Sequence, residues 1–310
     1  MHRLPRLALA LAALAAAQDV VFRVDVNLVN VPVHVTNPDG TVARNLKPED
    51  FEILDNGEPR RVENLWFESG LPLTIGIVMD VSDSQEDRAG EQRAALADFF
   101  RGVLRPGDRA FLVSVGAEVR LTRDLTADPE ELVRAIQLGA PVGPPLGGQC
   151  ALRVFAGLGK EPGAAISDCG GTALWNGVWA ALRLRLLETA GRKALIVMSD
   201  GVDTGSSRSF AETLVEAHRS EALVYAIKYP RHATARPVFR PQRLAEETGG
   251  LQFLAADGGY GAMFQRIADD LRNRYVIGFH PGETPGFHAL NISVKRDGAR
   301  VRSRAGYLRR

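Results

Sequence analysis

Apolar and polar residues alternate in this chain with a period that changes twice. Between residues 19 and 69 apolar residues recur at every second position, as in FRVDVNLVNVPVHV, and turn signals follow at NPDG (37–40) and DNG (55–57). A period of two with turns of this kind is typical of antiparallel β-strands. The apolar parity switches near Leu28, which indicates a bulge or bend. Residues 19–69 therefore predict a small antiparallel β unit, too short for a good core of its own.

From Leu73 the pattern becomes one of apolar strand runs separated by helical periodicity. One helix is predicted from apolar residues at positions 96, 99, 100 and 103, another over Ala173–Glu188, and two more from the capping signals at Asp128-Pro129 and Ser209. The strand runs are LTIGIVM (73–79), RAFLVSV (109–115), ALIVMSD (194–200) and ALVYAIKY (222–229). This alternation predicts a doubly wound α/β domain over residues 70–274 with a mostly parallel sheet.

The last part of the chain returns to a β pattern. YVIGFH (275–280), the alternating segment 290–294 and an Asp-Gly turn at 297–298 predict strands over residues 275–310. Two β fragments thus flank one α/β domain, and neither is long enough to bury a core alone. We therefore predict that residues 19–69 and 275–310 pair into one sandwich-like unit into which residues 70–274 are inserted.

The amino-terminal sequence indicates export. Residues 1–17, MHRLPRLALALAALAAA, have a basic start, an apolar run and small residues at a cleavage position, as in a signal peptide. The apolar run is shorter than the ~20 residues that span a bilayer, and no later segment reaches that length. We expect a secreted or periplasmic protein without a transmembrane segment after cleavage. The net charge of +1 gives no basic field for a nucleic-acid partner.

Cysteine occurs only at Cys150 and Cys169, both within the Gly- and Pro-rich stretch 139–171. In an oxidising compartment this pair predicts a disulfide that closes a small loop, with two unpaired thiols as the alternative. The cysteines and the scattered histidines have no zinc-ligand spacing, and we interpret the histidines as surface or partly packed residues.

Five oxygen-bearing side chains follow strand ends or begin a helix. Asp80, Ser82 and Ser84 alternate where strand 73–79 ends, Thr172 begins a helix after two glycines, and Asp200 ends strand 194–200. In a parallel α/β sheet such positions meet at the carboxyl edge, where ligands bind. Oxygen donors without His or Cys favour Mg²⁺, with Mn²⁺ or Ca²⁺ as alternatives. Turn and helix capping explains each residue singly but not their common location.

The segments DVSDS, GGT and MSDG resemble the metal-ion-dependent adhesion site (MIDAS) of the von Willebrand factor type A (VWA) domain. Two further segments resemble parts of exported VWFA-related bacterial proteins, namely LKPEDFEILDNGEPRRV near the start of the chain and GARVRSRAGYL at its end. The resemblance implies that Ser82 and Ser84 coordinate the metal directly, and that Thr172, Asp80 and Asp200 act directly or through water. Asp83 departs from the glycine that is usual in the family.

The leading hypothesis is a secreted binding protein, not an enzyme, whose metal ion accepts a carboxylate from an acidic residue of a protein partner. A Mg²⁺-dependent phosphoryl hydrolase with Asp80 as nucleophile is the alternative in another class. Haloacid dehalogenase-like hydrolases have an acid two residues further on, where this chain has Ser82, and a Gly-rich phosphate loop is absent. A scaffold whose metal site only stabilises the fold is the third reading.

Overall fold

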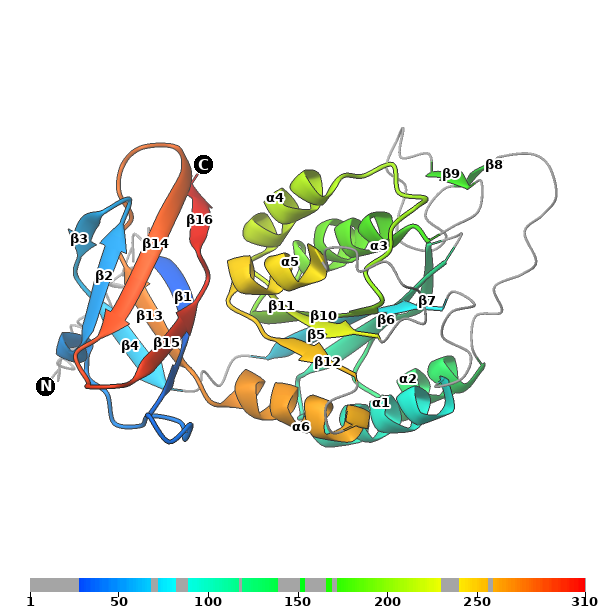
Figure 1. Ribbon diagram of the computed structural model, residues 1–310, viewed down its shortest axis with the longest axis horizontal. Coiled ribbons are helices and arrows are strands. Elements are labelled where there is room, and N and C mark those ends of the chain that lie inside the picture. The colour runs from blue at the N-terminus through cyan, green and yellow to red at the C-terminus, as the bar shows by residue number, and fades with distance from the viewer. Residues whose placement is uncertain are drawn as a thin grey trace, which may run out of the picture.

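The computed structural model describes residues 28–67, 72–81, 89–116, 119–138, 151–153, 166–168, 172–229, 240–255 and 259–309. A three-layer α/β domain lies beside a β-sandwich (Figure 1). Several predicted features lie outside the described residues: the signal sequence at 1–17, both cysteines, and Ser82, Asp83 and Ser84. No helix in the described ranges is long and apolar enough to cross a membrane.

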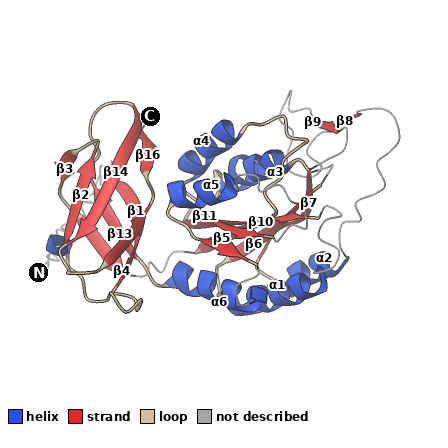
Figure 2. Ribbon diagram, in the orientation of Figure 1, coloured by secondary structure: helices blue, strands red, loops and turns tan. Residues whose placement is uncertain are grey.

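A mixed sheet forms the middle layer of the α/β domain (Figure 2). Its described strands pair in parallel except β7, the antiparallel edge strand. In spatial order they are β12 (Gln252–Leu254), β11 (Leu223–Lys228), β10 (Arg192–Ser199), β5 (Leu73–Asp80), β6 (Arg109–Val115) and β7 (Val119–Thr126). The predicted doubly wound α/β domain with a mostly parallel sheet is confirmed.

The central strands are apolar because helices cover both faces of the sheet. Every residue of β5 is buried, and so are the last six residues of β10. Parallel strands covered on both sides have this continuous apolar pattern, whereas a half-exposed strand alternates. The carboxyl ends of the parallel strands point away from the sandwich (Figure 1).

Two groups of helices cover the two faces of the sheet, and each group packs on its face through a separate apolar cluster. The first group is α1 (Ala89–Val103), α2 (Pro129–Leu138) and α6 (Gly259–Arg272). The second is α3 (Leu174–Ala181), α4 (Phe210–Ser220) and α5 (Arg240–Thr248). The helix predicted over Ala173–Glu188 is α3 followed by a π-helical turn at Leu182–Leu186, which shifts the register of the last turn.

The sandwich consists of two four-stranded antiparallel sheets. One has the order β15 (Arg300–Ser303), β1 (Val29–Thr36), β13 (Tyr275–Phe279) and β4 (Asn64–Phe67). The other has the order β16 (Gly306–Arg309), β14 (Gly286–Val294), β2 (Phe51–Asp55) and β3 (Glu58–Arg60), and a 3-10 turn at Pro48–Asp50 precedes β2. Each sheet combines strands from both ends of the chain, as predicted. The boundaries at 19–69, 70–274 and 275–310 themselves remain predictions.

The two connections to the α/β domain start from neighbouring strands. β4 pairs antiparallel with β13, and Phe67 at the end of β4 lies opposite Tyr275 at the start of β13. The chain therefore leaves the sandwich and returns to it at one place. An insertion into a continuous domain needs this adjacency of its two ends.

A buried polar network holds the second sheet of the sandwich together. The Asp55 side chain is inaccessible to solvent, and its carboxylate contacts His288 Nδ1 at 2.6 Å. It also accepts hydrogen bonds from Tyr307 Oη at 3.0 Å and from the backbone N–H of Gly282 at 2.8 Å. Burial raises the pKa of Asp55, but these hydrogen bonds outweigh it, and the net pKa is lowered. Sequence reasoning missed this network and the burial of His288.

Candidate functional site

Asp80 is the last residue of β5 and is buried. Its Oδ2 atom accepts a hydrogen bond of 2.8 Å from the hydroxyl of Ser199, which ends the neighbouring parallel strand β10. The same hydroxyl accepts a hydrogen bond of 2.9 Å from the backbone N–H of Gly201. Ser199 was not among the predicted site residues, although it directly precedes one of them. It joins the carboxyl ends of two strands at the site.

Asp200 follows β10 and is also buried. Its Oδ1 atom accepts a hydrogen bond of 2.9 Å from the backbone N–H of Val202, two residues further along the chain. An aspartate in this arrangement stabilises a turn, so the capping alternative applies to part of this side chain.

Thr172 is held across the carboxyl end of β5. The backbone N–H of Ala173 donates to the carbonyl of Gly116, which follows β6, at 2.8 Å. On the other side, the N–H of Thr172 donates to Thr204 Oγ1 at 3.0 Å, and its carbonyl accepts from the N–H groups of Thr204 and Gly205. Since β6 and β10 are the two neighbours of β5, these bonds place Thr172 at the same edge of the sheet as the end of β5.

The start of α3 is capped from a distant loop. Its N-cap residue is Ala173, whose side chain forms no cap. Instead Asp203 Oδ1 accepts from the N–H of Trp175 at 3.4 Å, and Ser206 Oγ accepts from the next N–H at 3.1 Å. The Ser206 hydroxyl in turn donates to Asp203 at 2.5 Å. Helix capping, the alternative explanation for Thr172, therefore does not apply at this helix, because the loop that contains Asp203 and Ser206 takes that role.

Close packing determines the height of α3 above the sheet. A Cβ atom added at Gly177 would lie 2.1 Å from Val115 Cγ1 and 3.6 Å from Val78 Cγ1. Only a residue without a side chain lets the helix approach β6 and β5 this closely. Because α3 begins two residues after Thr172, this contact also fixes the position of Thr172 relative to the strand ends.

A buried tyrosine lies close enough to the two carboxylates to be influenced by their charge. Tyr229, directly after β11, is inaccessible to solvent, and its hydroxyl donates to Gln92 Oε1 at 3.4 Å. Burial raises the pKa of Tyr229 well above its usual value, and the carboxylates of Asp80 and Asp200 raise it further. Gln92 in turn donates to Tyr260 Oη at 2.9 Å. No sequence pattern linked these residues, which come from three separate elements.

The structure thus places Asp80, Thr172 and Asp200 at the same edge of the sheet, and it does not describe Ser82 and Ser84. The donors are two carboxylates and one hydroxyl, a set that suits a hard cation. Across the described ranges, no cluster of three or more His, Cys, Asp or Glu residues could hold a metal ion. The predicted site differs from such clusters because hydroxyl groups make up most of its ligands.

Comparison with known proteins finds similar folds among solved structures. No family model and no curated protein matches the chain. An aerotolerance-related membrane protein from Bacteroides fragilis is similar at 13% identity over 64% of this chain and 98% of that one, with a TM-score of 0.45. The vWF domain of the type V pili tip protein Mfa5 from Porphyromonas gingivalis is similar at 14% identity over 64% and 94%, with a TM-score of 0.40.

A third similar structure comes from an animal matrix. Proximal thread matrix protein 1 from the mussel byssus, in a structure with a zinc-occupied MIDAS motif, is similar at 13% identity with a TM-score of 0.46. The match covers 69% of this chain and 48% of the mussel protein.

Proposed function

We propose that the protein is an exported binding module in which a divalent cation, held by Asp80, Ser82, Ser84, Thr172 and Asp200, captures a carboxylate of a protein partner. The observation that carries the proposal is the convergence of three of these side chains. Asp80, Thr172 and Asp200 come from segments far apart in the sequence, and all three are buried at one edge of the sheet. Burying two carboxylates near each other is costly unless a cation or hydrogen bonds compensate their charge.

The capping of α3 supports the role of Thr172. Because Asp203 and Ser206 accept from the first N–H groups of the helix, the Thr172 hydroxyl is not needed there. A threonine hydroxyl is a neutral ligand, so it would leave most of the charge of a bound Mg²⁺ available to an incoming anion. This is the property that a carboxylate-binding site needs. No observation favours the phosphoryl hydrolase, and we do not propose it.

Replacement of Thr172 by valine tests the proposal, because valine has the same shape and lacks the hydroxyl. We expect the affinity for Mn²⁺, measured by isothermal titration calorimetry, to fall by at least about 10-fold. The melting temperature should stay close to that of the wild type, since helix capping does not depend on this hydroxyl.

Ser206→Ala is the matched control for this experiment. It removes a hydroxyl that caps α3, so it should lower stability by about 1 kcal/mol and leave Mn²⁺ affinity unchanged. If the wild type takes up no Mn²⁺ or Mg²⁺ at millimolar concentration, the proposed metal site is wrong. If Ser206→Ala weakens Mn²⁺ binding as much as Thr172→Val does, the effect comes from the helix and not from a ligand.

We also propose that Cys150 and Cys169 form a disulfide in the exported protein. The short strands β8 (Ala151–Arg153) and β9 (Ile166–Asp168) pair antiparallel, with Ala151 opposite Asp168. The two cysteines directly flank these strands in the sequence, at positions 150 and 169. Residues directly opposite in antiparallel strands have Cα separations of about 4.5–5.5 Å, within the range that a disulfide bridges.

The intact mass of oxidised protein after alkylation under denaturing, non-reducing conditions tests the disulfide. We expect no alkylated cysteine before reduction and two after it. The bond should stabilise the protein by up to about 3 kcal/mol, since it closes a loop of roughly 20 residues in the unfolded chain. Two alkylated thiols in unreduced, exported material would contradict the proposal.

A further inference from the structure

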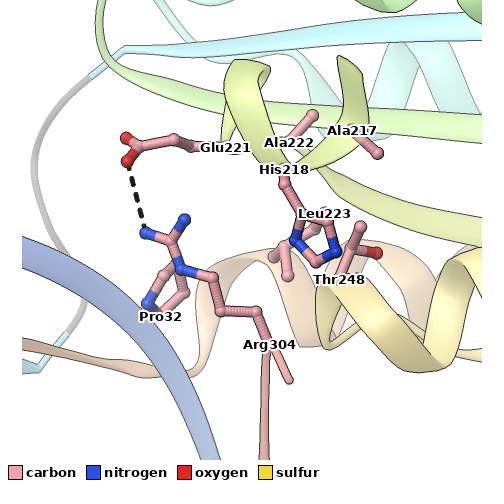
Figure 3. A pocket seen from close by; sticks show the side chains of 8 residues that line it. All are labelled: Pro32, Ala217, His218, Glu221, Ala222, Leu223, Thr248 and Arg304. Carbon is pink, nitrogen blue, oxygen red and sulfur yellow. Dashed lines mark hydrogen bonds and ion pairs between the residues drawn. The ribbon is translucent and has the colours of Figure 1, made fainter. Parts of the chain in front are cut away.

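The sandwich and the α/β domain meet at a small cavity, which we call the junction cavity. It has a volume of about 10 Å³ and is lined by residues from both parts (Figure 3). Pro32 and Arg304 belong to the sandwich, and the other lining residues belong to α4, β11, α5 and the turn between α4 and β11: Ala217, His218, Glu221, Ala222, Leu223 and Thr248. The volume suits one water-sized or monatomic species. The cavity is at the opposite end of the sheet from the candidate metal site.

Arg304 leaves two hydrogen-bond donors unused at this cavity. Its residue is only 5% exposed, and its Nη2 atom donates to the carbonyl of Asn30 at 2.7 Å and lies 3.4 Å from Glu221 Oε1. Its buried Nε and Nη1 atoms have no hydrogen-bond partner among the described residues. Buried donors without partners are rare in proteins because each costs about 1–3 kcal/mol. These two nitrogens therefore point to a ligand.

His218 supplies a second unsatisfied group on the same cavity. It is 7% exposed, and its ring packs edge-on against Phe287 with centroids 5.1 Å apart. The ring also bonds to the backbone carbonyl of Gly306, whereas its Nδ1 atom is buried without a partner in the described part of the chain. Figure 3 shows the ring beside the stem of Arg304, while the guanidinium extends toward Glu221.

The junction carries more buried positive than negative charge. Arg274 is also buried, and its Nε and Nη1 atoms likewise find no partner within the described ranges. The buried carboxylate of Asp270 is already bound to Arg302 and accepts a hydrogen bond from Tyr225 Oη at 2.6 Å. Glu221, the ion-pair partner of Arg304, has a side chain that is 57% exposed, so solvent weakens its compensation of that charge. A negative ligand would correct this imbalance.

We propose that the junction cavity binds a small inorganic anion of about the size of chloride. The anion would accept hydrogen bonds from the unused nitrogens of Arg304 and would link the sandwich to the α/β domain. This site is independent of the proposed metal site and of its function.

His218 makes this anion site sensitive to pH. Burial lowers the pKa of His218, Glu247 on α5 raises it, and Arg304 lowers it again. Glu221 lines the same cavity, and Glu216 and Arg219 are neighbours of His218 along α4. In the neutral ring that donates to Gly306, Nδ1 is an acceptor, and protonation makes it a donor to an anion. Anion binding should therefore strengthen as the pH falls and His218 takes up a proton.

Crystals of the full chain soaked in sodium bromide at mildly acidic pH test the proposal directly. We expect an anomalous difference peak within hydrogen-bond distance of Arg304 Nε or Nη1. A wild-type crystal with no bromide peak in the junction cavity, or with water alone there, would overturn it.

Thermal melting gives a second test in solution. Chloride should raise the melting temperature of the wild type by about 2 °C relative to gluconate at equal ionic strength. Arg304→Met should abolish this rise, while Arg300→Met, at an exposed arginine of β15, the strand that directly precedes Arg304, should retain it. Equal rises in both variants would contradict the proposal.

If Arg304→Met does not fold, His218→Phe provides a further test. This variant should still be stabilised by chloride, but the stabilisation should no longer grow as the pH falls. An unchanged pH dependence would contradict the link between His218 protonation and anion binding.

Discussion

Asp80→Asn should lower the affinity for Mg²⁺ or Mn²⁺ by at least about 100-fold, because loss of a group that merely orients a ligand already costs 10-fold to 100-fold. Asparagine has nearly the same shape, and its amide oxygen can still accept the hydrogen bond that Ser199 Oγ donates to Asp80. The fold should therefore be retained while one of the two carboxylates of the proposed set is lost. Calorimetric titration of either ion into the purified variant measures the effect.

Asp98→Asn is a matched control for this substitution, since Asp98 lies on α1 with 82% of its side chain exposed. It removes the same charge from the protein without touching the strand ends, and its affinity for the cation should equal that of the wild type. Wild-type affinity in Asp80→Asn would show that any cation taken up binds elsewhere. An equal loss in both variants would assign the effect to net charge alone.

Asp55→Ala should destabilise the protein by about 3–5 kcal/mol, because each buried polar group left without a partner costs about 1–3 kcal/mol. The change would leave His288 Nδ1, Tyr307 Oη and the N–H of Gly282 buried without their common acceptor. Urea unfolding followed by circular dichroism gives the difference in the free energy of unfolding. A loss below about 1 kcal/mol would contradict the role assigned to this network.

Glu52→Ala provides the control on the same strand, because Glu52 is exposed and contacts only surface groups of β14 and Lys295. It should change stability by less than about 0.5 kcal/mol. The pH dependence adds a second check, since the pKa of Asp55 is lowered from the value of 3.8 for an unperturbed aspartate. The ionised Asp55 carboxylate contributes fully to the free energy of unfolding above pH 3.8, and this contribution is lost as the pH falls through the lowered pKa. The difference in stability between the wild type and Asp55→Ala should therefore become smaller in acid.

The sequence predicts best those elements whose environment is uniform along their whole length. β5 and β10 are apolar runs because both faces of the sheet are covered, and Asp80 and Asp200 could be placed at the carboxyl edge because they end such runs. The capping box at Ser209 is local in sequence and is found as predicted, with Glu212 as its second member. For these features a short window of sequence contains all the interacting groups.

The features that the sequence does not predict depend on distant partners. The contact between Asp55 and His288 spans 233 positions, so nothing near either residue in the sequence indicates that the two side chains are buried together. The cap of α3 comes from Asp203, 28 positions after the N–H group whose hydrogen bond it accepts, so the sequence near the helix start does not indicate it. β7 was not predicted because five of its eight residues are polar. Most of its residues are only partly buried, so apolar and polar positions do not alternate clearly along this edge strand.

The assembly of each sandwich sheet from both ends of the chain has a consequence for folding. β1 pairs with β15 and β13, and β2 pairs with β14, so none of the amino-terminal strands can complete its sheet until the last part of the chain is available. During synthesis the α/β domain can fold first through contacts within its own segment, while the edges of β1 and β2 remain unpaired. Closing so long a loop is slow, although each doubling of its length adds only about 0.6 kcal/mol. Closure of the sandwich should therefore be the late step, and the amino-terminal strands are the segment most exposed to aggregation or to a chaperone until it occurs.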